Sequence, residues 1–329
     1  MSNKLYESGI EQITLEMLRD ENGYGLAYGP ELLEGDAPER GYGDLVLQNR
    51  LRTAIDRINP RIPKTAREEA FKKVLRTSAL TVIDNNETFH HLLTEGVDVK
   101  FSVGDGKSRT DKVWLVDFEH PESDKNEFLA VNQFTVVENN VNKRPDIVLF
   151  INGLPLVVIE LKNAADEKAD VQAAFNQLQT YQQVIPSLFT FTAFEVISDG
   201  WFAKAGTISS DYSRFMEWKS VDGVHVIDSK HQSELEPLVK GLLNKKTLLD
   251  IIRHFIVFEK TKERTIKKVA AYHQYFAVNK AIISTLRASA NENGHFAAEH
   301  PAVYGLPTVD HQPKGDKRAG VVWHTQGSG

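Results

Sequence analysis

The 329-residue sequence contains no cysteine. This absence excludes disulfide bonds, thiolate nucleophiles and cysteine-ligated zinc or iron–sulfur sites, so histidine, aspartate and glutamate remain as the metal-binding side chains. No apolar run is long enough to cross a bilayer, and the N-terminus lacks the basic and then apolar order of a secretory signal. We therefore expect a cytoplasmic protein with no membrane partner.

An excess of positive charge is also missing. The chain has 39 lysines and arginines against 45 aspartates and glutamates, a formal net charge of -6, so as a whole it lacks the electrostatic footprint of a nucleic-acid binder. Its most basic stretch lies between Arg50 and Lys73, where Asp56, Glu68 and Glu69 are interspersed. Mixed charges of this kind are typical of a solvated helix face, and contact with DNA would have to depend on local patches.

Several catalytic motifs are absent as well. The sequence has no GxSxG elbow and no HExxH spacing, which argues against an α/β-hydrolase and a helix-borne zinc site. Gly106, Lys107 and Ser108 imitate the end of a phosphate-binding loop, but Phe101 stands where that loop needs glycine. We interpret this stretch as a polar turn.

Hydrophobic patterning predicts an α/β fold in two parts. Helical spacing covers residues 7–18, 44–58, 65–83, 87–94 and 166–185, and residues rich in β-branched and aromatic side chains predict strands at 97–103, 112–118, 128–137 and 188–197. After about residue 220 the pattern is mainly helical. We expect a central mixed sheet flanked by helices over 1–220, followed by a mainly helical segment over 221–329.

The strongest local signal is a hairpin. Two apolar runs, Asp146–Ile151 and Leu156–Leu161, are joined around Asn152 and Gly153, a dipeptide that favours a tight turn. Because both runs are almost continuously apolar, we expect both strands to be buried on both faces and to lie centrally in the sheet.

Three charged residues fall at one end of this hairpin. Glu160 and Lys162 are two residues apart, so the period of a strand puts both side chains on one face. Pairing the strands back from the turn brings Asp146 near Glu160. Charged groups at the end of a buried strand must pair, reach solvent or hold a ligand, because burying them unpaired costs several kcal/mol.

This arrangement fits a Mg²⁺ site that cleaves phosphodiesters. Two carboxylates provide the oxygen ligands that the cation prefers, and Lys162 could stabilise a hydroxide or the developing phosphorane charge. The alternative is a structural cluster of ion pairs at a strand end.

The order of these residues resembles the PD-(D/E)xK nuclease signature, with Arg144-Pro145-Asp146 followed after thirteen residues by Glu160-Leu161-Lys162. The flanking stretches 141–163 and 86–97 resemble the N-terminal nuclease part of the restriction (motor) subunit of type I restriction-modification enzymes. Downstream, Gln177 and Tyr181 match that family's QxxxY motif and share a helix face.

The resemblance implies roles for several residues. It implies a restriction-endonuclease-like core in which Asp146, Glu160 and the carbonyl of Leu161 hold Mg²⁺, while Gln177 and Tyr181 orient the site or the DNA. In related nucleases an early helix supplies a further glutamate near the metal. Glu7 and Glu11 both qualify, and Glu11 fits the usual wording better because it follows Gly-Ile.

A second resemblance concerns the end of the chain. Residues 319–329 run from an apolar strand into a glycine-rich loop and resemble the start of helicase motif I, with Gly327 and Gly329 as candidate cofactor-binding residues. Upstream, Gln274 is the candidate for reading adenine. We expect a truncated RecA-like translocase domain that lacks the lysine and hydroxyl needed for ATP hydrolysis, so ATP would act only in the full-length protein.

The resulting hypothesis is an endonuclease that cleaves double-stranded DNA with Mg²⁺. The family resemblance implies methyltransferase (M) and specificity (S) subunits as partners and coupling to ATP-dependent translocation. Two alternatives stay open. A non-catalytic docking module in a DNA-processing complex would show no Mg²⁺ affinity and would tolerate Glu160→Gln. A nucleotide-binding module would bind ATP as the isolated chain.

Overall fold

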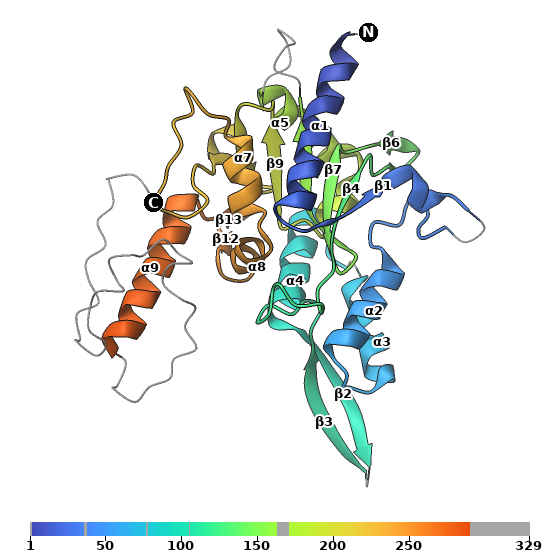
Figure 1. Ribbon diagram of the computed structural model, residues 1–329. Helices are drawn as coiled ribbons and strands as arrows, with labels where there is room; N and C mark the ends of the chain where they lie inside the picture. Colours follow the sequence, from blue (N-terminus) through green and yellow to red (C-terminus); the bar gives the residue numbers. More distant parts are fainter. Residues whose placement is uncertain (1, 36–37, 77, 105, 163–170, 290–329) are drawn as a thin grey trace.

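The computed structural model describes residues 2–35, 38–76, 78–104, 106–162 and 171–289 (Figure 1). Its centre is a seven-stranded sheet. In spatial order the strands are β1 (Gly25–Tyr28), β4 (Phe128–Asn132), β7 (Ile147–Ile151), β8 (Leu154–Leu161), β9 (Phe194–Ser198), β10 (Ala203–Gly206) and β11 (Met216–Glu217). The pairs β1–β4 and β8–β9 are parallel and the other neighbours antiparallel, so the predicted mixed sheet is confirmed.

Helices cover both faces of this sheet. On one face, α1 (Ser2–Asp20) and α4 (Val82–Glu95) share a core cluster with alternate residues of β7 and β8. On the other, α5 (Val171–Val184) and the short α6 (Pro186–Phe189) pack on the residues between them. Every residue of β7 and β8 is buried, which confirms the prediction of a central hairpin covered on both faces.

Smaller elements lie outside the central sheet. These are the 3-10 turns η1 (Gly29–Leu33) and η2 (Tyr212–Arg214), helices α2 (Gln48–Ile58) and α3 (Lys64–Val74), and two hairpins, β2 (Val97–Gly104) with β3 (Lys107–Val113) and β5 (Val136–Glu138) with β6 (Val141–Lys143). The β2–β3 hairpin projects from the body (Figure 1). Its second strand begins five residues before the predicted strand 112–118, because residues 107–111 pair with β2 despite their polar character.

The basic stretch of α2 and α3 is tied into the surface of the fold. Arg50 pairs with Glu39 and Glu127, and Arg52 with Glu68. These ion pairs agree with the interpretation of a solvated helix face with mixed charges.

The chain after residue 220 forms α7 (Leu235–Pro237), a π-helical turn η3 (Leu238–Leu242), α8 (Lys245–His254), a hairpin of β12 (Ile256–Lys260) and β13 (Thr265–Val269), and α9 (Tyr272–Ser289). The hairpin departs from the mainly helical expectation. Residues of η3, α8 and α9 belong to the same apolar cluster as α1 and the sheet. The predicted RecA-like part lies outside the described residues beyond 289, and the boundary at 220 stays a prediction. Among the described residues, no helix has the length and apolar character needed to span a membrane.

Candidate active site

The site-forming end of the β7–β8 hairpin depends on an irregularity in the strand pairing. Near the turn, Ile151 faces Leu154 and Phe150 faces Pro155, but Leu149 faces Val157, so Leu156 is an extra residue in β8. Leu156 and Val157 both join the cluster on the α1 side. The shift makes Ile147 face Ile159, and the next rung along the ladder therefore joins Asp146 and Glu160.

Hydrogen bonds fix the three predicted residues at this end of the sheet. The Leu161 backbone N–H donates to Asp146 Oδ2 at 2.7 Å. Lys162 Nζ lies 2.7 Å from Glu160 Oε1 and donates to the Leu161 carbonyl at 3.0 Å. The Lys162 backbone N–H donates to the Ser198 carbonyl at 2.8 Å, which continues the parallel pairing with β9. The predicted convergence of Asp146, Glu160 and Lys162 is present.

Burial makes this cluster electrostatically unusual. Glu160 is only 1% exposed, while the Lys162 side chain keeps 19% of its exposure and reaches solvent. Glu160 alternates with Ile159 and Leu161, which face α1, so its side chain lies on the α5 side. A carboxylate so deeply buried requires a compensating cation, and Lys162 provides one in this structure.

Helix α5 brings Gln177 and Tyr181 to the same place. Gln177 Nε2 donates to the Tyr181 hydroxyl at 2.9 Å, and that hydroxyl donates to the Arg144 carbonyl at 3.4 Å. Burial, and next the negative charge of Glu160, raises the pKa of Tyr181 above its usual range. The phenol therefore stays neutral and links α5 to the chain just before Asp146.

Glu11 on α1 reaches the same sheet end from another direction. Its two carboxylate oxygens accept hydrogen bonds from Asn132 Nδ2 at 2.7 Å and Gln133 Nε2 at 2.8 Å. The Gln133 backbone N–H in turn donates to the Asp146 carbonyl at 2.9 Å. Glu7, the alternative, lies on α1 but its side chain is outside the described part of the chain. Our reading of the sequence missed Asn132 and Gln133, whose only signal is two amides directly after an apolar strand.

The donor set fits a hard divalent cation. The oxygens at this end come from Asp146, Glu160 and the Leu161 carbonyl, with no histidine nitrogen among them. Mg²⁺ is commonly bound through one or two carboxylates, with water and substrate phosphate completing its shell. Within the described residues no three acidic or histidine side chains gather closely enough to hold a metal, so Glu11 does not complete such a triad here.

Comparisons with known proteins show the family of this chain. Residues 4–214, which include all of these residues, match the family described as type I restriction enzyme R protein N terminus. The chain belongs to this family. It is 39% identical over 336 residues to the type I restriction enzyme HindI endonuclease subunit of Haemophilus influenzae, covering 99% of this chain and 29% of that protein. It is 32% identical over 344 residues to the putative type I restriction enzyme MjaIXP endonuclease subunit of Methanocaldococcus jannaschii, covering 97% and 30%.

The chain thus spans about three-tenths of the length of these relatives. The family match ends at residue 214, whereas the similarity to the two relatives covers nearly the whole chain. The predicted membership of the restriction subunit family is confirmed, and the roles assigned to individual residues stay predictions.

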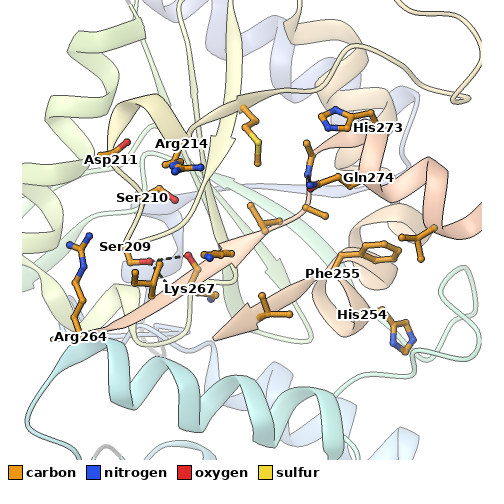
Figure 2. A pocket seen from close by; sticks show the side chains of 18 residues that line it. Ser209, Ser210, Asp211, Arg214, His254, Phe255, Arg264, Lys267, His273 and Gln274 are labelled. Carbon is orange, nitrogen blue, oxygen red and sulfur yellow. Dashed lines mark hydrogen bonds between the residues drawn. The ribbon is translucent and has the colours of Figure 1, made fainter. Parts of the chain in front are cut away.

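The R-protein chain has a second candidate site around Gln274. A cavity of about 860 Å³ lies between residues 209–216, the β12–β13 hairpin and the start of α9. Figure 2 shows Gln274 and His273 on one side and Ser209, Arg214 and Lys267 on the other. Gln274 Oε1 accepts a hydrogen bond from the Ala271 backbone N–H at 3.0 Å, so it also caps α9. The other two cofactor candidates, Gly327 and Gly329, lie outside the described residues.

Proposed function

We propose that this chain is the Mg²⁺-dependent endonuclease part of a type I restriction R subunit, and that it cleaves double-stranded DNA. The observation that carries the proposal is the hydrogen bond from the Leu161 N–H to Asp146 Oδ2, at 2.7 Å. It holds one carboxylate against the strand that carries the other, with Lys162 on the outer side of Glu160. A structural ion pair accounts for Glu160 and Lys162, whereas a metal site also uses the carboxylate of Asp146.

Each residue has a part in the proposed reaction. Asp146, Glu160 and the Leu161 carbonyl hold the cation, which when bound lowers the pKa of a water and offsets negative charge on the phosphate. Lys162 Nζ is partly solvent-exposed beside Glu160 and donates a hydrogen bond to the attacking water or the developing negative charge. Gln177 and Tyr181 keep Arg144 and the adjoining Asp146 in place, since the Tyr181 hydroxyl donates to the Arg144 carbonyl.

The wider role extends to the whole protein. Its family membership supports a role in a type I restriction enzyme. We propose that M and S subunits assemble with the full-length R subunit on DNA, and that ATP-dependent translocation precedes cleavage. The net charge of -6 gives this part little general attraction for DNA, so delivery of DNA by the other parts is consistent with its composition.

The test combines metal binding with cleavage. Asp146→Ala and Glu160→Ala should each abolish Mg²⁺ binding by the chain, measured by calorimetry, and cleavage by the assembled full-length enzyme. Lys162→Ala should still bind Mg²⁺ but lose cleavage. Asp124→Asn is the control, since Asp124 is exposed and distant in sequence from these residues. If Mg²⁺ binds as well after either acidic residue is replaced, the proposed metal site is rejected in favour of a docking module, which tolerates Glu160→Gln.

A second candidate function has its own observation. Gln274 lines the cavity of about 860 Å³, whose other polar residues include Arg214, Arg264 and Lys268. We propose that this cavity receives the adenine end of a nucleotide in the full-length subunit. Gln274→Ala should then weaken ATP binding by that subunit while leaving Mg²⁺ binding at Asp146 unchanged. Equal ATP affinity in both proteins would reject this role.

A further inference from the structure

The turn that follows β4 lies against two residues of the candidate site. The β4–β7 ladder ends with Asn132 facing Ile147, and the next residue, Gln133, donates its backbone N–H to the Asp146 carbonyl at 2.9 Å. The backbone of Gln133 therefore anchors the main chain of Asp146, whose side chain is one of the two carboxylates of the candidate site.

The side chains of the same turn hold Glu11. Asn132 Nδ2 and Gln133 Nε2 donate to different oxygens of its carboxylate, at 2.7 and 2.8 Å. Both donors are neutral amides, and no lysine, arginine or histidine of the described chain forms an ion pair with Glu11. Amide donors orient a carboxylate without neutralising it, so Glu11 keeps a negative charge that acts through space on a cation at Asp146 and Glu160, without joining them as a ligand.

Gln133 maintains these contacts in an unfavourable backbone conformation. Its φ of 56° lies in the left-handed region, which costs a non-glycine residue on the order of 1 kcal/mol. Gly29 packs directly on this turn, since a Cβ there would lie 2.4 Å from the Gln133 carbonyl oxygen and 2.9 Å from that of Asn132. The surrounding structure therefore enforces the conformation, and residues held in this way concentrate at functional sites.

Glycine would adopt this backbone without strain, so the presence of a glutamine calls for a reason. Glycine lacks the glutamine side chain, and the polar part of that side chain, its amide, contacts Glu11. We propose that Gln133 is a positioning residue of the nuclease site. Its backbone fixes Asp146, and its side chain together with Asn132 directs the Glu11 carboxylate to the same end of the sheet. The inference rests on the proposed nuclease function.

The informative variant is Gln133→Gly, because it keeps the left-handed turn and deletes the side chain that carries the amide. We expect a thermal midpoint at or above that of the wild type. In calorimetry Mg²⁺ should bind about tenfold more weakly, and the assembled full-length enzyme should need about tenfold more Mg²⁺ for half-maximal cleavage. Gln133→Glu should be worse than Gln133→Gly, since it sets a second carboxylate against Glu11.

A matched control and a double variant separate positioning from folding. Asn139 also has a left-handed backbone, with φ of 49°, in the exposed β5–β6 turn, so Asn139→Gly should leave Mg²⁺ binding and cleavage unchanged. If Gln133 acts through Glu11, then adding Gln133→Gly to Glu11→Gln should cost no more than Glu11→Gln alone.

The possible outcomes separate the positioning role of Gln133 from the proposed nuclease function. Wild-type Mg²⁺ affinity in Gln133→Gly, or a loss that follows a lowered thermal midpoint, overturns the positioning role while Asp146→Ala still abolishes cleavage. Undiminished cleavage by Asp146→Ala and Glu160→Ala instead overturns the proposed nuclease function itself.

Discussion

The backbone N–H of Leu161 donates a 2.7 Å hydrogen bond to Oδ2 of Asp146. This bond crosses from β8 to the residue preceding β7, so one carboxylate is oriented by the main chain beside the other carboxylate. Side-chain rotation at Asp146 is thereby restricted before any cation arrives, which lowers the conformational entropy cost of binding one.

A bound Mg²⁺ ion should compensate for the stability that is lost when Lys162 is replaced. Lys162→Met removes the ammonium that lies 2.7 Å from the buried Glu160 carboxylate, which should cost about 3 kcal/mol of unfolding free energy in the absence of Mg²⁺. Added Mg²⁺ should restore more stability to this variant than to the wild type, as thermal unfolding at increasing Mg²⁺ would show. Lys107→Met, at an exposed position of β3, is the control. Equal Mg²⁺ responses in all three proteins would argue against a cation at Glu160.

Tyr181→Phe should separate activity from stability. The change removes the hydroxyl that accepts from Gln177 and donates to the Arg144 carbonyl, and its cost in unfolding free energy should be about 1 kcal/mol. Cleavage by the full-length enzyme should fall further, by up to about 100-fold, because Asp146 loses a support two residues away. Tyr42→Phe, at an exposed tyrosine, serves for comparison. Cleavage at the wild-type rate would show that the hydroxyl has no part in the site.

A buried lysine predicts how stability depends on pH. Burial lowers the pKa of Lys267 to about 7, while its ammonium donates to Asn86 Oδ1 and the Thr192 carbonyl, both at 2.8 Å. The folded state therefore binds fewer protons than the unfolded state between about pH 7 and the ordinary lysine pKa, and stability rises with pH across that window. Burial raises the pKa of Glu195 to about 7, which acts in the opposite direction only below that pH.

Lys267→Met should remove this rise. Between about pH 8 and about pH 10 the wild type should gain about 2 kcal/mol of unfolding free energy relative to the variant, measured by urea denaturation. Lys268→Met is the matched control, because the adjacent lysine is exposed at the surface and pairs with Glu259. Parallel pH profiles of wild type and Lys267→Met would contradict the assignment.

The hairpin turn between β7 and β8 offers a prediction about stability. Gly153 has φ of 80°, and a Cβ there would lie 2.5 Å from the Leu47 carbonyl oxygen, so Gly153→Ala should cost roughly 2–3 kcal/mol. Gly104 has φ of 95° with open space around it, so Gly104→Ala should cost only about 1 kcal/mol. Chemical denaturation of the two variants gives the comparison, and similar losses would show that the contact with Leu47 is unimportant.

The sequence sufficed to predict the centre of the fold and the convergence of Asp146, Glu160 and Lys162. Asn152 and Gly153 define the turn, and the two long apolar runs predict that both strands of the hairpin are buried, as they are. These signals are local. The strand period of two puts Glu160 and Lys162 on one face, whereas the rung shared by Asp146 and Glu160 also depends on the unpaired Leu156 in β8.

Other features depend on partners that are distant in sequence. The four residues of β1 are mostly exposed and form a strand only because β4 pairs with them. The hairpin of β12 and β13 lay within stretches whose apolar spacing also suited helices. The two amides of Asn132 and Gln133 do not reveal their role, because their partner Glu11 lies more than a hundred residues earlier.

The extra residue in β8 links the spacing of the motif to its geometry. Across a hairpin closed by a two-residue turn, facing residues are always separated by an even number of others, as Ile151 and Leu154 are. Thirteen residues separate Asp146 from Glu160, an odd number, so the two can share a rung only because Leu156 is left unpaired. For any relative with the same tight turn in which the two acidic residues share a rung, an odd spacing therefore requires an unpaired residue in the hairpin, and an even spacing excludes a single one-residue bulge.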